Sequence, residues 1–195
     1  MPSQRHIVPD EETSTADRLL DAAYACVMDV GLRRTTVADV ARRAGVSRMT
    51  VYRQHADLDS LVGALLKREL VAVLDQAQQE VAHLPTARQR LVEASVLAVD
   101  RIDRHPLYRR VLDLDPELLL PLVVDRFGST QLAAREVVRQ QLEKGQQDGS
   151  IRQADTSLQA TCFLLTVQSF VFSARLVEPL GVSDELRVLL GGYLR

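Results

Sequence analysis

Apolar residues recur at helical spacing through most of this chain, and that pattern predicts an all-α protein. The first amphipathic stripe ends at Gly31, a residue that tolerates the backbone angles needed after a helix. Its apolar members are Leu19, Ala22, Ala23, Cys26, Val27 and Val30. No segment alternates apolar and polar residues in the way that marks a half-buried strand. We therefore expect helices throughout.

Two short helical patterns follow, with Gly45 between them. The first begins after Thr36, and the second begins after Ser47 and runs to about His55; each hydroxyl can accept a hydrogen bond from the first turn of its helix. Val51 is expected to point inward. The side chains left facing outward are Arg48, Met49, Thr50, Tyr52, Arg53 and Gln54.

Two short helices hinged by a glycine predict a helix-turn-helix, whose second helix enters the major groove of DNA. Side chains such as Arg, Gln, Thr and Tyr can reach both base edges and phosphates. An ordinary helix corner with a solvated polar face is the alternative.

The remaining helices are marked by capping residues and prolines. Asp57 or Asp59 begins a long connecting helix that runs to about Val81, and Gly149 turns the chain later on. Further helices are expected at 87–103, 106–114, 116–127, 129–147 and 156–176, with a short segment from Ser183. The predicted organisation is a flexible arm at 1–13, a helix-turn-helix domain at 14–56 and a helical ligand-binding and dimerisation domain at 57–195.

Charge is distributed unevenly along the chain. The whole sequence of 195 residues carries a formal net charge of -2, which argues against a globally basic nucleic-acid binder. Between residues 33 and 55, however, Asp39 is the one acidic residue, and the basic residues are Arg33, Arg34, Arg42, Arg43, Arg48 and Arg53. Positive charge is therefore concentrated on the expected DNA-binding domain, where phosphates would be bound.

The segment 156–176 is apolar nearly all round, so it must be covered on more than one side. A second copy of the chain is the simplest cover, because the helix at 129–147 carries a further apolar stripe beside it. The residues predicted at such a dimer interface are Leu132, Val138, Leu142, Phe163, Val167, Phe170 and Val171. A central core helix in a monomer is the alternative.

A ligand cavity is expected between the helices of the second domain. The residues predicted to line it are Leu91, Ala98, Ile102, Tyr108, Phe127, Gln141, Phe163 and Gln168. Each of them is equally well explained as ordinary core.

The sequence gives little indication of a disulfide, a metal or cofactor site, or a membrane segment. Cys26 and Cys162 lie in apolar stretches, and buried thiols in a reducing cytosol fit them better than a disulfide. The histidines share no metal-ligand spacing and there is no glycine-rich phosphate loop, so neither a metal nor another cofactor is expected. Without a signal peptide or a sufficiently long apolar run, we expect a cytoplasmic protein without a membrane partner.

These residues together resemble the TetR family of bacterial transcriptional regulators over essentially the whole chain, most strongly from Arg18 to Leu66. The matching positions are Ala22, Ala23, Gly31, Thr35, Thr36, Val37, Asp39, Val40, Ala41, Ala44, Gly45, Val46, Ser47, Thr50, Tyr52 and Leu61. The resemblance implies that Thr36, Thr50 and Tyr52 hold phosphates and that Arg48, Met49 and Arg53 lie at or near base edges.

The chain departs from the family pattern at a few positions. Met49 stands where small residues are common, and Leu58 stands where a phosphate-binding lysine is frequent. Gln54 and His55 replace a common His-Phe pair, which puts a polar ring where an aromatic ring normally packs.

We therefore expect a homodimeric DNA-binding regulator, a repressor released from a palindromic operator when a small apolar or amphipathic molecule enters the second domain. One rival is a ligand-independent activator or architectural DNA-binding protein with a filled body. Another is an all-α interaction protein or enzyme whose helix corner is purely structural.

Overall fold

The computed structural model describes residues 14–114, 127–177 and 182–195, and these residues form helices joined by turns, without a strand. The helices are α1 (Thr15–Val30), α2 (Val37–Ala44), α3 (Arg48–Gln54), α4 (Leu58–Glu80), α5 (Ala87–Arg104), α6 (Pro106–Leu114), α8 (Ser129–Gln147), α9 (Thr156–Val177) and α10 (Val182–Tyr193). The all-α prediction is confirmed. The expected arm at 1–13 and nearly all of the expected helix at 116–127 lie outside the described residues.

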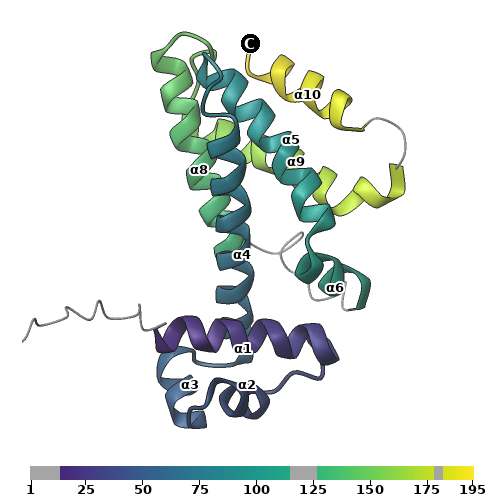
Figure 1. Cartoon of the computed structure of the whole chain (residues 1–195). Coiled ribbons are helices and arrows are strands. Elements are labelled where there is room, and N and C mark those ends of the chain that lie inside the picture. Colours follow the sequence, from purple (N-terminus) through teal and green to yellow (C-terminus); the bar gives the residue numbers. More distant parts are fainter. Residues whose placement is uncertain (1–13, 115–126, 178–181) are drawn as a thin grey trace, which may run out of the picture.

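The helices divide into a small head and a larger body (Figure 1). Helices α1, α2 and α3 form the head, with α2 and α3 on the side of α1 that faces away from the body. Helix α4 begins in the head and runs the length of the body, where α5 and α8 pack against it and α9 packs against α5 and α8. Helix α6 packs against both α1 and α5, so it lies where head and body meet.

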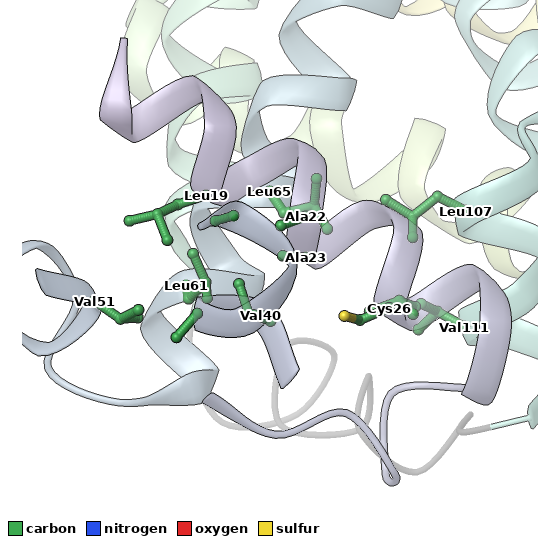
Figure 2. Close-up of a cluster of buried hydrophobic side chains, with 13 residues drawn as sticks. Leu19, Ala22, Ala23, Cys26, Val40, Val51, Leu61, Leu65, Leu107 and Val111 are labelled. Carbon is green, nitrogen blue, oxygen red and sulfur yellow. The ribbon is translucent and has the colours of Figure 1, made fainter. Parts of the chain in front are cut away.

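The head is built around its own apolar core, shown in Figure 2. Leu19, Val40 and Val51 are fully buried there, one from each of the three head helices. Leu61 and Leu65 of α4 and Leu107 and Val111 of α6 complete the same cluster. The core of the head therefore extends beyond residue 56, where a domain boundary was expected, and it ties α4 and α6 to the head.

Side-chain caps fix where the head helices begin. The Thr36 hydroxyl accepts the Asp39 N–H at 3.2 Å, and the Ser47 hydroxyl accepts the Thr50 N–H at 3.1 Å. Asp57 caps α4 by accepting the Ser60 N–H at 2.7 Å. Each cap satisfies an amide of the first turn that has no partner within its own helix.

The body core lies between α5, α8, α9 and α10. Phe163, Leu142 and Leu190 are among its fully buried members. The turn after α8 packs unusually closely, because a Cβ added at Gly145 would overlap the end of the Ile151 side chain and lie 3.0 Å from its Cβ. Gly149 turns the chain there with a φ of 73°, as expected for the left-handed region that glycine tolerates.

The two cysteines differ in exposure. Cys26 is buried in the head, as predicted, and burial raises the pKa of its thiol. Cys162 is exposed on α9, so the prediction that it is buried is wrong for the single chain. An apolar segment alone did not reveal which face of α9 the neighbouring helices cover.

Candidate functional site

A tight turn between α2 and α3 sets the direction of α3. Gly45 ends α2 in the left-handed conformation with a φ of 68°, and the Val46 N–H donates to the Ala41 carbonyl at 3.0 Å. Val51 then anchors the inner face of α3 with no exposed surface. These contacts hold the opposite face of α3 outward, as the sequence predicted.

The outer face of α3 is polar and open. Met49 is 74% exposed and Tyr52 is 47% exposed, and Arg48, Arg53 and Gln54 are exposed beside them. A single exposed apolar side chain is common on protein surfaces, so Met49 indicates a binding face only together with the exposed polar and charged side chains around it. The geometry therefore brings together, on one exposed helix face, most of the side chains that the sequence assigned to DNA.

Five of the head arginines fall into two groups. Arg42 pairs with Asp39 at 2.7 Å and Arg43 pairs with Asp29 at 2.6 Å. Arg34, Arg48 and Arg53 are exposed and form no ion pair with any residue that the structure describes. Ion pairs thus neutralise part of the positive charge inferred from the sequence. Both arginines of α3, Arg48 and Arg53, keep a charge that no ion pair with a described residue neutralises.

The hydroxyl groups predicted at phosphates have partners within the head. Thr36 Oγ1 donates to Asp39 Oδ2 at 2.6 Å, and Ser47 Oγ lies 3.0 Å from Thr50 Oγ1. Both threonines therefore stabilise the starts of their helices. A phosphate contact by either would be an additional bond or would require the present one to open.

His55 ends α3, and its N–H donates to the Val51 carbonyl at 2.8 Å. The ring is partly buried, and burial lowers the pKa of His55 below its ordinary value of 6.5. The imidazole is therefore neutral at neutral pH, which suits a ring that stands in a packing position under α3.

The body contains a partly open cavity of about 410 Å³ between α4, α5, α6, α8 and α9. This volume lies within the range typical of small-molecule sites. Of the residues predicted to line it, those that do so are Leu91, Ala98, Ile102, Tyr108, Gln141, Phe163 and Gln168. Phe127, which precedes the first residue of α8, is not among the lining residues.

Polar groups meet in the wall of this cavity at each end. Gln141 Nε2 donates to Gln78 Oε1 at 3.1 Å, and Gln131 Nε2 donates to Gln168 Oε1 at 2.7 Å. Between head and body, the Tyr108 hydroxyl donates to the Leu66 carbonyl at 2.8 Å. Burial, with a smaller contribution from the negative charge of Glu69, raises the pKa of Tyr108, so the hydroxyl stays protonated and able to donate.

Sequence reasoning did not single out the contribution of α4 to the wall, because its leucines are equally explained as helix packing. The spacing of four that joins Leu66, Leu70, Leu74 and Gln78 was nevertheless readable as one helix face. Arg90 and Lys144 also line the cavity.

The predicted dimer residues separate into core and surface. Val138, Leu142 and Phe163 are at most 9% exposed, so the structure places them in the core of the single chain instead. Leu132 is 44% exposed, and Val167, Phe170 and Val171 are half-buried.

Helix α9 carries an exposed stripe that the sequence did not reveal. It consists of Leu158, Cys162, Leu165 and Ser169, spaced so that they lie on one helix face. Leu158 is 65% exposed and Leu165 is 47% exposed. Leucines exposed in this way favour a contact with another molecule.

Two kinds of site are not found in the described residues. No three His, Cys, Asp or Glu side chains within 14–114, 127–177 and 182–195 gather closely enough to hold a metal ion. In the same residues, every helix is too short or too polar to span a membrane.

Comparisons with known proteins agree on the head and extend to the whole chain. The family model described as "Bacterial regulatory proteins, tetR family" matches residues 19–65. An uncharacterized HTH-type transcriptional regulator of Mycobacterium tuberculosis is 35% identical over 189 residues, which cover 95% of this chain and 97% of that protein.

Solved structures share the fold. The transcriptional repressor QsdR of Rhodococcus erythropolis, from the TetR family, has a TM-score of 0.74 at 14% identity, covering 92% of this chain and 94% of its own. The regulator FadR of Bacillus subtilis in complex with stearoyl-CoA has a TM-score of 0.56 at 17% identity, covering 91% of this chain and 98% of its own.

Proposed function

The chain belongs to the TetR family of bacterial regulatory proteins, and on that premise we propose that it is a homodimeric repressor whose operator is palindromic. As an HTH-type transcriptional regulator it is a DNA-binding protein and not an enzyme. In this proposal it acts in the cytoplasm and leaves its operator when a small apolar or amphipathic molecule enters the body cavity.

The single observation that carries the proposed DNA contact is the outer face of α3. Arg48 and Arg53 are exposed there without an ion-pair partner among the described residues, and Tyr52 and Gln54 lie beside them. Arginine can bind guanine through two hydrogen bonds in the major groove, and tyrosine can donate to a phosphate. We assign base contacts to Arg48, Met49 and Arg53, and phosphate contacts to Arg34 and Tyr52. Thr36, Thr50 and Gln54 remain candidates at the edge of this surface.

The cavity supports the proposed response to a ligand. Protein interiors are normally close-packed, and a regulator that responds to no ligand has no need of a cavity. The 410 Å³ cavity therefore favours a ligand-responsive regulator over a ligand-independent DNA-binding protein with a filled body. FadR of Bacillus subtilis, which has the same fold, is described in complex with stearoyl-CoA.

Helix α6 provides a physical connection between the cavity and the head. Tyr108 and Leu112 line the cavity, whereas Leu107 of the same helix packs in the head core. A ligand that displaces Tyr108 would also disturb its bond to the Leu66 carbonyl of α4. Movement of α4 and α6 would then change the separation of the two α3 helices in a dimer.

Binding energies limit this mechanism. A ligand shifts the equilibrium only by its difference in affinity for the two conformations, and converting a mostly DNA-competent population into a mostly released one takes about 5 kcal/mol. The proposed ligand must therefore make contacts in the released form that the DNA-bound form does not allow.

Selection of bound sequences from random duplexes tests the proposal, followed by titration of the selected duplex with purified protein at increasing salt. We expect a site with twofold symmetry and an affinity that falls as salt rises, because bound phosphates release counterions. A failure to enrich any sequence, with no duplex binding at low salt, would contradict the proposal.

A further inference from the structure

The lining of the cavity changes character along its length. The face of α4 that lines it runs from Leu66 near the head to Gln78 near the far end, a rise of roughly 18 Å for an α-helix. Leu70, Leu74, Leu91 and Phe163 form part of the wall between these ends. The cavity is therefore elongated and apolar over its middle.

Both positively charged side chains of the lining lie at the end far from the head. Arg90 lies near the start of α5, and Lys144 lies in the last turn of α8. The end of α4, the start of α5 and the end of α8 are neighbours at the end of the body far from the head (Figure 1). No Asp or Glu side chain lines the cavity among the described residues. Neither Arg90 nor Lys144 forms an ion pair with a described residue.

The location of Arg90 is not explained by the dipole of its own helix. A positive charge suits the carbonyl end of a helix, which accounts for Lys144, but it is unfavourable near the amino end, where Arg90 lies. Arg90 Nη1 donates to the Leu84 carbonyl at 2.7 Å, which holds the guanidinium in place. The nearby Asp148 accepts the N–H groups of Ala87 at 2.8 Å and Ser150 at 2.9 Å. Its pKa is lowered mainly by hydrogen bonds from Ser150 and Ala87, with a smaller contribution from the positive charge of Arg90.

The end near the head offers no charged partner to a ligand. The Tyr108 hydroxyl is used by the Leu66 carbonyl, and one N–H of the Gln131 amide is used by Gln168. Gln131 Oε1 accepts the Gly128 N–H at 2.8 Å. A charged group placed here would lose its water without finding a charged partner, at a large cost in free energy.

Resting on the proposed function, we propose that the effector is an anionic amphiphile with a single elongated apolar tail. Its carboxylate or phosphate group binds at Arg90 and Lys144, with Gln78 and Gln141 beside them, and its tail extends between α4, α5 and α9 toward Tyr108. Bonds between an anion and a guanidinium or ammonium group are stronger than bonds between neutral groups. The ligand therefore binds in one orientation, with its apolar end against α6.

Binding of three probes with the same tail tests the charge preference. Dodecanoate, dodecanol and dodecyltrimethylammonium are titrated into the full chain by calorimetry, each below the concentration at which it forms micelles. We expect dodecanoate to bind most tightly and the cationic probe most weakly. Equal affinity for dodecanoate and dodecanol, or no binding of dodecanoate, would overturn the inference.

Variants locate the anion. Arg90→Gln and Lys144→Gln should each weaken dodecanoate binding by about ten- to a hundredfold, while dodecanol binding stays within about twofold. Arg88→Gln is the matched control, since Arg88 lies in the same turn of α5 and does not line the cavity. Unchanged dodecanoate affinity in Arg90→Gln, with a melting temperature like that of the unaltered protein, would also overturn the inference.

Release from the selected duplex separates this inference from the proposed function. If the protein binds the duplex and only dodecanol releases it, regulation by a ligand stands and the anionic preference falls. If dodecanoate binds with the expected dependence on Arg90 but no sequence is ever bound, the ligand site stands and the proposed repressor falls.

Discussion

At the scale of single residues, the outer face of α3 combines two kinds of DNA contact. Arginines that reach base edges discriminate between sequences, whereas contacts to phosphates strengthen binding to every sequence. Arg53 and Tyr52 are adjacent, and both are exposed. Substitutions at these neighbours should therefore have different consequences.

Arg53→Ala should weaken binding to the preferred duplex by about 1 to 3 kcal/mol and relax the preference at one base pair in each half-site. Tyr52→Phe should weaken all duplexes to a similar extent. Fluorescence anisotropy on the preferred duplex and on single-base variants measures both effects. Arg42→Ala is the control, because Arg42 already pairs with Asp39. A loss confined to one base pair in Tyr52→Phe would show that the two roles are misassigned.

His55 should make the stability of the protein depend on pH. Because burial lowers its pKa in the folded chain below the ordinary 6.5, the unfolded chain binds the proton more readily. The folded state should therefore lose stability as the pH falls below about 6.5, and regain it above. Thermal unfolding between pH 5 and pH 8 should show a smaller acid loss in His55→Phe. Identical pH profiles would mean that this ring does not carry the effect.

At the scale of helices, the sequence predicted where elements begin better than which faces they bury. The caps at Thr36, Ser47 and Asp57 are local, since each hydrogen bond spans three residues, and a single sequence reveals them. Burial depends on distant helices. Leu142 and Phe163 are apolar whether they lie in a core or at an interface, so periodicity could not separate these places.

In the candidate site, too, local features were predictable from the sequence and contacts between distant helices were not. The side chains of α3 were predictable, because one buried residue, Val51, fixes which face turns outward. The ion pair of Arg43 with Asp29 could not be predicted from the sequence, because the two partners come from different helices, α2 and α1. Similarly, Arg90 and Lys144 approach one cavity only because α5 and α8 lie side by side.

Close packing at the end of α8 leads to a prediction about stability. A methyl group at Gly145 would overlap the Ile151 side chain, so Gly145→Ala should destabilise the fold by about 1 to 3 kcal/mol. Chemical denaturation measures the change. The double variant Gly145→Ala with Ile151→Ala removes the two shortest contacts, those with Cδ1 and Cγ1 of Ile151, and keeps the contact with its Cβ at 3.0 Å. It also loses apolar contacts of Ile151. If Gly145→Ala costs as much in the Ile151→Ala background as in the unaltered chain, overlap with the end of the Ile151 side chain is not the cause.

At the scale of the whole molecule, the arrangement requires two copies to read a palindrome. The exposed stripe Leu158, Cys162, Leu165 and Ser169 on α9, together with Leu132 on α8, is the surface we propose for the partner. A twofold contact between such faces would bury the leucines and complete a four-helix arrangement of α8 and α9.

Leu165→Arg should therefore convert the dimer to a monomer, because two buried charges would face each other across the twofold axis or lie in an apolar contact. Sedimentation velocity measures the mass. Leu189→Arg is the matched control, since Leu189 is 52% exposed on α10 and lies outside the proposed contact. An intact dimer in Leu165→Arg, or a monomer in the unaltered protein, would contradict the proposed interface.

The central claim is that α3 enters the major groove twice in each assembled molecule. It is tested most directly by titrating the protein against the selected full palindrome and against a duplex that holds one half-site, at low and at moderate salt. We predict that one dimer binds the palindrome, that the half-site binds far more weakly, and that both affinities fall with salt. Equal affinity for the two duplexes, or no binding to either at low salt, would contradict the account.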